Sequence, residues 1–424
     1  MKVLVLGSGG REHALVWRLS RDPNVAEILT APGNPGTSAI GRNVNVDLMS
    51  PKDVLALAAR EKVDLTVVGP EAPLESGVAD LFRSHGRPIV GPSKRGAALE
   101  CSKAHAKAFM SRHGIPTARF AVCDTAESAL AAVSGARFGF PVVVKADGLA
   151  AGKGVTVAAD RAEAEAAVRA AMVDKQFGAA GSRVVIEECL SGPEVSLFFL
   201  CDGEHASYLG SAQDHKRIFD DDRGPNTGGM GAFAPSPLAT LDLVRDTYER
   251  IVQPVVDGHA EMGEPYRGFL YVSLMLTADG AKVIEFNVRF GDPEAQVVLP
   301  LIDGGFAGLL RGAAEGAFVG PPVVSPDKTV GVVLASRGYP ASAESGVPID
   351  GVDRAAELPG VTVFHAGTKM QDGRLVTAGG RVLTVVGRGA TYREAMDRAY
   401  AAVREIRFDG MQYRTDIGKK AIGT

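Results

Sequence analysis

The stretch "VVVKADGLAAGKGVTV", residues 142–157, joins an apolar run that ends in a lysine to a glycine-rich loop around a second lysine, Lys153. Exposed backbone N–H groups and an ammonium group together make a cradle for phosphate, so this pattern predicts a phosphate-binding segment. A P-loop is excluded because Gly148 and Gly152 are one residue too close together. In addition, Gly154 stands where a P-loop has Ser or Thr. The β-branched alternation that follows predicts a second strand, so we expect a glycine loop between two strands that covers a phosphate chain.

Size and composition limit the class of protein. The chain has 424 residues, of which 46% are apolar and 23% charged, and this predicts a globular protein of two to four domains. A formal net charge of −4 with dispersed basic residues argues against nucleic acid and anionic membranes as partners. The N-terminal apolar run is too short for a signal peptide and no run is long enough to span a membrane, so we expect a cytoplasmic protein. Cys101, Cys123, Cys189 and Cys201 form no C-x-x-C pair, which disfavours zinc and disulfides and predicts reduced core residues.

The first hundred residues alternate short apolar strands with helical patterns, which predicts a parallel α/β sheet covered on both faces. Ligands of such sheets bind beyond the carboxyl ends of the strands. Three exits rich in glycine or proline are expected there: "GSGGREH" (7–13), "APGNPG" (31–36) and "GPE" (69–71).

The first exit predicts a phosphate site at a helix N-terminus. The N–H groups of Gly9, Gly10 and Arg11 would point at a single phosphate, and the helix dipole would attract it. Glu12 stands where a dinucleotide-binding fingerprint has its third glycine, which disfavours a dehydrogenase. The alternative is a tight strand-to-helix turn that needs glycine for backbone reasons alone.

The middle of the chain has an α+β pattern that predicts a nucleoside triphosphate site. Lys145 at a strand end and Lys103 at the head of a helix can both reach phosphate oxygens as point charges. The alternative is a pair of surface lysines. In "VVIEECLSGPEV" (184–195) the end of a buried strand, at Glu187 and Leu190, can recognise an adenine edge, and Glu194 can accept hydrogen bonds from ribose hydroxyls.

The stretch "VIEFNVRFGDPE" (283–294) predicts a metal site. In a strand Glu285 and Asn287 point to the same face, and a carboxylate with an amide oxygen suits Mg²⁺ bound to phosphates. Arg289 continues that face as a bidentate donor for a developing phosphoryl or acyl phosphate. The alternative is an ordinary half-exposed strand.

Two further segments complete the chain. In "QDHKRIFDDDRGPNTGGMGAFAP" (213–235) Asp214 can hold an ammonium group, and the turn from Thr227 to Gly231 can offer backbone donors to a small carboxylate. His215 is expected to be structural, since no nucleophile stands near it. A Pro-rich linker, "VGPPVVSPD", then leads to a compact α/β module of about the last hundred residues.

Five segments together carry a resemblance to a known family: "LVLGSGGREHAL", "DGLAAGKGV", "QDHKR", "PNTGGMGAFAP" and "EFNVRFGDPE". They resemble the phosphoribosylamine–glycine ligases of the ATP-grasp superfamily, and the match covers essentially the whole chain. The resemblance implies ligation of glycine to 5-phosphoribosylamine with ATP, through glycyl phosphate, in purine synthesis. It also implies Mg²⁺ or Mn²⁺ and a monomer. No covalent protein nucleophile is implied, so catalysis would consist of positioning and charge neutralisation.

The implied fold is multidomain α/β and α+β. It has a parallel, biotin-carboxylase-like N-terminal domain (1–102), an ATP-grasp core of two subdomains (103–318, with a lid at about 120–190) and a small C-terminal domain (325–424). Carried over residue by residue, the resemblance implies an ATP site of Lys103, Lys145, Gly148, Gly152, Lys153, Gly154, Glu187, Leu190 and Glu194. It implies a metal on Glu285 and Asn287, with Arg289, Lys145 and Asp292 catalytic. It implies substrate contacts by Gly9, Gly10, Arg11, Glu12, Glu71, Asp214, Asn226, Thr227, Gly228 and Gly229.

Departures from the family pattern and rival functions stay open at this point. "FLYVSLMLT" has no acidic metal ligand, which leaves the number of metal ions open, and Lys419 stands where a histidine is common. The competing functions are a sister ATP-grasp ligase using bicarbonate or formate and a nucleotide-binding regulator without turnover. "QDHKR" with "PNTGGMGAF" favours the glycine ligase over the first. The anion site at "GSGGRE" and the paired Arg289 and Asp292 are not needed by the second.

Overall fold

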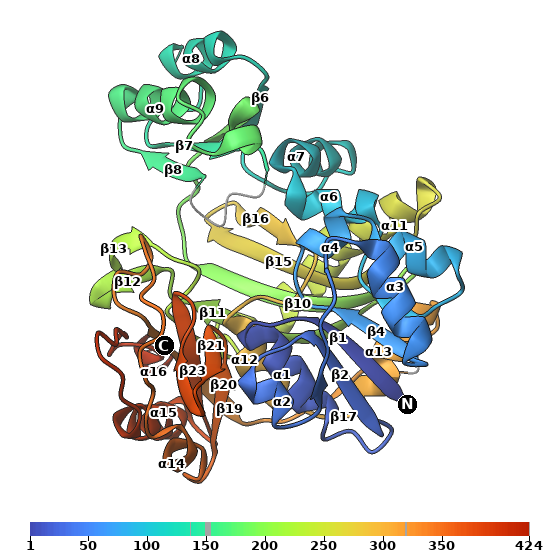
Figure 1. Cartoon of the computed structure of the whole chain (residues 1–424). Coiled ribbons are helices and arrows are strands. Elements are labelled where there is room, and N and C mark those ends of the chain that lie inside the picture. The colour runs from blue at the N-terminus through green and yellow to red at the C-terminus, as the bar shows by residue number, and fades with distance from the viewer. Residues whose placement is uncertain (136, 149–153, 319, 424) are drawn as a thin grey trace.

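The structure is a computed structural model of the chain and describes residues 1–135, 137–148, 154–318 and 320–423 (Figure 1). Its N-terminal region is a parallel sheet in the order β3-β2-β1-β4-β5. The strands are β1 (Lys2–Gly7), β2 (Glu27–Pro32), β3 (Arg42–Asn43), β4 (Leu65–Val68) and β5 (Ile89–Val90). The predicted parallel sheet is therefore confirmed.

Both faces of this sheet are covered by helices. Val3 and Val5 of β1 share a core with α1 (Gly10–Leu19) and α13 (Phe306–Glu315). Leu4 and Leu6 point to the other face and share a core with α3 (Pro51–Arg60) and α5 (Val78–Ser84). A strand buried on both faces has no polar alternation, which explains the continuous apolar run at the start of the chain.

A second, smaller unit stands apart from the rest of the molecule at the top of Figure 1. Its antiparallel sheet has the order β6-β9-β7-β8, and α8 (Ala126–Ser134) and α9 (Arg161–Val168) enclose a core of its own. The strands are β6 (Phe120–Cys123), β7 (Val142–Ala146), β8 (Val155–Ala158) and β9 (Val184–Glu188). Ala146 N donates to Gly154 O at 2.8 Å, so the glycine loop connects two paired strands, as predicted. We call this unit the lid.

The largest sheet is antiparallel and has the order β16-β15-β10-β11-β14-β19-β23-β20. Its strands are β10 (Glu194–Asp202), β11 (Ala206–Asp214), β14 (Gly231–Ala234), β15 (Arg267–Thr277), β16 (Gly280–Asn287), β19 (Lys328–Ala335), β20 (Val361–His365) and β23 (Arg381–Gly389). Because β14 pairs with both β11 and β19, the sheet crosses the linker without a break. The C-terminal module, with α15 (Tyr392–Glu405), is thus joined to the core by strand pairing. The domain boundaries stay predictions.

The other elements within the described residues are short. The helices are α2 (Pro35–Ser38), α4 (Ala72–Glu75), α6 (Lys94–Cys101), α7 (Lys103–Arg112), α10 (Leu241–Thr247), α11 (Gln253–Glu261), α12 (Glu294–Val298), α14 (Val352–Ala356) and α16 (Lys419–Ile422). The strands are β12 (Arg217–Phe219) with β13 (Arg223–Asn226), β17 (Ile302–Gly304) with β18 (Val323–Val324), and β21 (Thr368–Gln371) with β22 (Arg374–Thr377). No helix in the described part of the chain is both long and apolar enough to cross a membrane.

Candidate active site

Two lysines meet one glutamate at the base of the lid. Glu187 Oε2 accepts Lys145 Nζ at 3.1 Å and Lys107 Nζ at 3.0 Å, and all three side chains are buried. Glu187 Oε1 is also buried but has no hydrogen-bond partner within the described residues. Burial lowers the pKa of Lys107 to about 8, and the nearby Glu187 opposes that shift. The cluster is a preformed, mostly satisfied set of charges with one free acceptor.

This cluster also ties the lid to the large sheet. Lys145 Nζ donates to Ile284 O of β16 at 3.3 Å. Lys107 Nζ donates to Thr117 Oγ1 at 2.7 Å, and Thr117 Oγ1 in turn donates to Val283 O at 2.7 Å. The predicted lysine of the quoted stretch therefore lies beside the predicted metal strand, although the two are far apart in sequence.

Lys103 lies beside the start of the glycine loop. Its Nζ donates to Gly148 O at 3.2 Å, and Asp147 Oδ1 accepts Ala104 N at 3.1 Å and so caps the start of α7. Gly148 has a φ of +139°, and a Cβ built there would lie 2.8 Å from the Cβ of Ala180, so only glycine fits without strain. The predicted contacts of Gly152 and Lys153 lie outside the described residues.

The metal strand has the predicted arrangement of Glu285 and Asn287. Their cross-strand partners on β15 are Ser273 and Tyr271, which are two residues apart and so confirm a shared face. Neither the Glu285 nor the Asn287 side chain makes a hydrogen bond within the described residues, so both oxygens are free for a ligand. That donor set fits Mg²⁺, which keeps several waters and shares phosphate oxygens. No group of three His, Cys, Asp or Glu side chains in the described part of the chain could hold a metal, in line with the missing acid on the preceding strand.

Glu285 lies within the field of several cations. Burial alone would raise the pKa of its carboxyl group, but the positive charges of the surrounding side chains lower it below its ordinary value. Those cations are Lys216, Lys145, Lys103 and Arg289. They come from β7, from α7 and from the segments that follow β11 and β16, so the fold gathers the predicted charges around one carboxylate.

Arg289 lies in the segment after β16, and two carboxylates from other parts of the chain hold its guanidinium group. Its NH2 donates to Glu100 Oε1 at 2.6 Å, and its Nε lies 3.4 Å from Glu71 Oε2. Glu100 also accepts Val288 N at 2.8 Å. Burial opposes the charge of Arg289, but Glu100 and then Glu71 raise its pKa above the ordinary value. Sequence reasoning missed Glu100, which lies in α6 without any motif around it.

Glu12 explains the unusual first exit. A Cβ built on Gly7 or Gly69 would lie within 2.6 Å of Glu12 side-chain atoms, so this side chain fills the space between the ends of β1 and β4. Its Oε2 accepts Gly9 N at 2.6 Å, and its Oε1 accepts Arg11 Nε at 2.6 Å. The turn thus uses a carboxylate where a dinucleotide fold has a third glycine.

Asp292 closes the same turn from the other side. Its Oδ2 accepts Arg11 N at 3.3 Å, and its Oδ1 accepts Gln296 Nε2 at 2.9 Å and lies 3.4 Å from Arg381 NH1. Two of the N–H groups predicted to hold a phosphate, those of Gly9 and Arg11, therefore donate to carboxylates here. Gln296 and Arg381 carry no sequence signal for this contact, because both reach Asp292 only through the fold.

An acidic pair, the buried Glu294 and the half-buried Asp214, lies near the end of β11. Asp214 and Glu294 act on one another, and burial raises the pKa of both, that of Glu294 to about 7. Tyr271 OH donates to Glu294 Oε1 at 2.8 Å and hydrogen-bonds Ser196 Oγ at 2.8 Å. Glu294 ends the quoted metal stretch, but its burial was not predicted from sequence.

The predicted ribose and glycine contacts have mixed surroundings. Glu194 Oε2 accepts a hydrogen bond from Lys216 Nζ at 2.8 Å, and both side chains are partly exposed to solvent. Thr227 N donates to Lys216 O at 2.7 Å, and Gly229 N donates to Thr227 Oγ1 at 3.0 Å. These two backbone donors of the turn therefore already have acceptors in the protein. Gly228 N donates to Tyr339 OH at 2.9 Å.

The two remaining predicted residues lie at the edges of this region. Asn226 pairs with Arg217 between β12 and β13 and is exposed. Leu190 follows β9 and is half-buried.

Comparisons with known proteins agree along the whole chain. Family models of phosphoribosylglycinamide synthetase match residues 1–100 (N domain), 101–295 (ATP-grasp (A) domain) and 329–420 (C domain). Relatives named phosphoribosylamine–glycine ligase from Phenylobacterium zucineum and Ralstonia nicotianae are each 49% identical and match over 100% of both chains. The solved ligase of Thermotoga maritima is 35% identical with a TM-score of 0.86, covering 98% of this chain and 100% of its own. The biotin carboxylase domain of Hydrogenobacter thermophilus 2-oxoglutarate carboxylase, solved with MgADP and bicarbonate, shares the fold at 18% identity and a TM-score of 0.73, covering 97% and 91% of the two chains.

Proposed function

The chain belongs to the phosphoribosylamine–glycine ligase family, and from this premise we propose how its residues join glycine to 5-phosphoribosylamine. The enzyme is an ATP-dependent ligase of purine biosynthesis that forms ADP. Glycine carboxylate attacks the γ-phosphorus of ATP and ADP leaves, which gives glycyl phosphate. The amine of phosphoribosylamine then attacks the carbonyl carbon, phosphate leaves, and glycinamide ribonucleotide forms.

The nucleotide binds between the lid and the large sheet. Lys103 and Lys145 neutralise the phosphate chain, which the loop of residues 148–154 covers. The adenine meets Glu187 and Leu190 at the end of β9, and Glu194 accepts a ribose hydroxyl. The free, buried Oε1 of Glu187 supports this proposal, because the exocyclic amino group of adenine would supply the missing donor.

A divalent metal binds Glu285 and Asn287. Both are hard oxygen donors without another partner, which suits Mg²⁺ or Mn²⁺. When bound, the metal neutralises charge on the transferred phosphoryl group. The chain itself supplies the remaining positive charge through Lys145 and Arg289, and the carboxylates that hold Arg289 fix its direction.

Glycine binds between the metal strand and the turn of residues 226–229. Asp214 with Glu294 holds its ammonium group, and the carboxylate faces Arg289 and the γ-phosphate. Two carboxyl groups that repel one another are stabilised in their charged forms once a cation lies between them, which is the physical argument for this assignment.

Phosphoribosylamine binds at the first strand exit. Its phosphate meets Gly9, Gly10, Arg11 and Glu12, its ribose lies near Glu71, and Asp292 lies next to the acyl phosphate. At present Gly9 N donates to the Glu12 carboxylate and Arg11 N donates to the Asp292 carboxylate. A phosphate bound at this turn would replace these two carboxylates as the acceptor of both N–H groups. We also expect the enzyme to act as a monomer in the cytoplasm, with light scattering as the test of the monomer.

The concentration of four cations around Glu285 is the observation that carries this proposal, because it matches a triphosphate and a metal at one place. The acyl phosphate step is tested with glycine labelled with ¹⁸O in its carboxylate. Attack by that carboxylate leaves one labelled oxygen on the phosphate released in each turnover, which mass spectrometry detects. Unlabelled phosphate from a reaction that still makes glycinamide ribonucleotide would overturn the glycyl phosphate route.

A further inference from the structure

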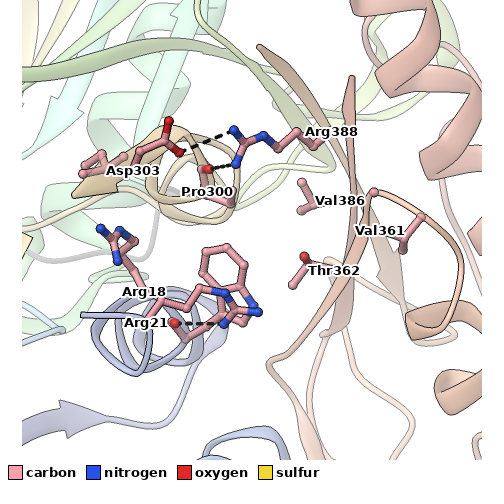
Figure 2. Close-up of a pocket in the computed structure, with 11 residues that line it drawn as sticks. Arg18, Arg21, Pro300, Asp303, Val361, Thr362, Val386 and Arg388 are labelled. Carbon is pink, nitrogen blue, oxygen red and sulfur yellow. Dashed lines mark hydrogen bonds and ion pairs between the residues drawn. The ribbon is translucent and has the colours of Figure 1, made fainter. Parts of the chain in front are cut away.

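A cavity of about 220 Å³ lies between the last turn of α1 and the C-terminal strands (Figure 2). Trp17 is among its lining residues. Figure 2 shows Arg18 and Arg21 on one side, Asp303 above, and Thr362 and Arg388 on the other side. The first turn of α1 carries the proposed phosphoribosylamine contacts. Because α1 has ten residues, its two ends are about 15 Å apart, and the cavity lies at the end away from the active site.

The charges of Arg388 and Asp303 are already paired. Arg388 Nε donates to Asp327 Oδ2 at 2.7 Å, and its NH1 donates to Pro300 O at 2.8 Å. Its NH2 lies 3.4 Å from Asp303 Oδ1. Arg388 is therefore already held by two carboxylates, and the charge of Asp303 also acts on Arg18.

Arg18 makes no such contact within the described residues, although the charges of Asp22 and Asp303 act on it. Only 2% of the residue is exposed, yet its guanidinium makes no hydrogen bond or ion pair within the described residues, and its buried Nε is unsatisfied. The nearby Asp22 carboxylate is committed elsewhere, since it accepts Ala307 N at 3.0 Å and Asn24 N at 3.1 Å. A buried guanidinium keeps its charge and is costly to leave unpaired.

Arg21 adds a second cation beside it. Its guanidinium carbon lies 3.8 Å from the centre of the Trp17 ring, and its NH1 donates to Trp17 O at 3.2 Å. Burial and the neighbouring charge of Arg18 lower the pKa of Arg21, so the two arginines repel one another. The Thr362 hydroxyl on the opposite wall is also without a hydrogen-bond partner in the described part of the chain.

We propose that this cavity binds a small phosphate-bearing anion, inorganic phosphate or a small phosphate monoester, between Arg18 and Arg21. The planar fork of arginine matches phosphate oxygens, and an anion here would satisfy the free Nε and relieve the repulsion between the two guanidinium groups. The volume is below the roughly 300–1,000 Å³ of sites for drug-sized ligands, which excludes a whole nucleotide. The bound anion would join α1 of the N-terminal sheet to β20 and β23 of the C-terminal module.

The chain carries its own reporter for this site, because Trp17 is the one tryptophan of the sequence. Trp17 emission is titrated with potassium phosphate and with glycerol phosphate, at an ionic strength held constant with potassium chloride. Melting temperature is measured in the same solutions as a second readout. Citrate serves as a carboxylate anion for comparison.

The variants are Arg18→Met, Arg21→Gln and, as a matched control, Arg60→Met at an exposed position on α3. Wild type and Arg60→Met should show a saturable response in emission or melting temperature, and Arg18→Met and Arg21→Gln should weaken it by at least about tenfold. The melting temperature of Arg18→Met without phosphate is its own baseline, and only the shift that phosphate adds to it is compared with wild type. Should Arg18→Met fail to fold, Arg21→Gln carries the same test.

A tighter midpoint for glycerol phosphate would assign the site to a phosphate ester, and equal midpoints would assign it to the phosphate group alone. The proposal is overturned if neither readout saturates with either phosphate ligand. It is also overturned if citrate binds and phosphate does not, or if the folded Arg18 and Arg21 variants respond like wild type.

Discussion

Glu294 is a buried carboxyl group whose surroundings favour its protonated form. Burial and then the nearby Asp214 raise its pKa to about 7, while the hydrogen bond from Tyr271 OH partly opposes them. In the proposed role Glu294 must be ionised to hold the ammonium group of glycine. It would therefore bind that group more strongly as the pH rises through about 7. If Glu294 holds the ammonium group of glycine as proposed, glycine binding depends on pH in the physiological range.

We predict that kcat/KM for glycine rises with pH across about 7 in the wild-type enzyme. Glu294→Gln should remove this limb and raise KM for glycine, because the amide cannot ionise. Tyr271→Phe should move the limb to higher pH, because the variant loses the hydrogen bond that lowers the Glu294 pKa. Steady-state pH profiles measure all three, and an unchanged limb in Glu294→Gln would contradict the role.

At the residue scale the sequence predicts what local spacing can encode. The alternation of Glu285 and Asn287 on one strand face needs only the two-residue period of a strand, and the structure confirms it. The partners of Arg289 could not be predicted, because Glu100 lies 189 residues away in sequence. The role of Glu12 in filling space was also missed, since it depends on Gly69 of another strand.

Helix α7 and strand β9 meet through the buried pair of Lys107 and Glu187. Removing the Lys107 ammonium leaves the buried Glu187 carboxylate with Lys145 as its one ion-pair partner within the described residues, and it also removes the hydrogen bond to Thr117. The contact therefore fixes the base of the lid against the helix that leads into it.

Lys107→Met should reduce the free energy of unfolding by about 2 kcal/mol, below the usual range for a broken buried pair because Lys145 remains. Urea denaturation measures it, with Arg112→Met at an exposed position of the same helix as the control. The double variant Lys107→Met/Glu187→Gln should lose less free energy of unfolding than the two single variants lose together, because the two residues interact. Strict additivity would show that the pair contributes no coupling.

Single residues with strong backbone preferences decide where some of the helices and strands begin and end. In the structure α10 and α11 are joined by a π turn at Tyr248–Val252. Pro254 lies just after this turn and has no N–H group to donate, which accounts for the local change in hydrogen bonding. The strand that follows the glycine loop was predicted correctly because its residues show a β-branched alternation.

The whole molecule combines one long shared sheet with a lid that has its own core. The strand pairing of β14 with β19 could not be predicted, because β14 is short and its partner lies beyond a Pro-rich linker. The sequence therefore predicts an appended module where the structure has a continuous sheet. Its motifs predicted the family correctly, since those signals are local.

Hydrogen exchange should separate these two parts of the molecule. Amides of β7, β8 and the segment around residues 148–154 should exchange more slowly with Mg-ATP, because nucleotide closes a small unit that has few contacts with the rest. Amides of β14 and β19 should exchange at the same slow rate in both states. Equal exchange of the lid with and without Mg-ATP would contradict closure of the lid on nucleotide.

The central claim is that Glu285 and its surrounding cations make this chain a glycine-dependent ligase. The most direct measurement is ADP release with Mg-ATP, glycine and phosphoribosylamine generated in situ, on wild type, Glu285→Gln and the exposed control Glu204→Gln. We predict that release requires both substrates, is unchanged in Glu204→Gln and falls by at least about a hundredfold in Glu285→Gln. Release that ignores glycine, or a Glu285→Gln enzyme as active as wild type, would contradict the account.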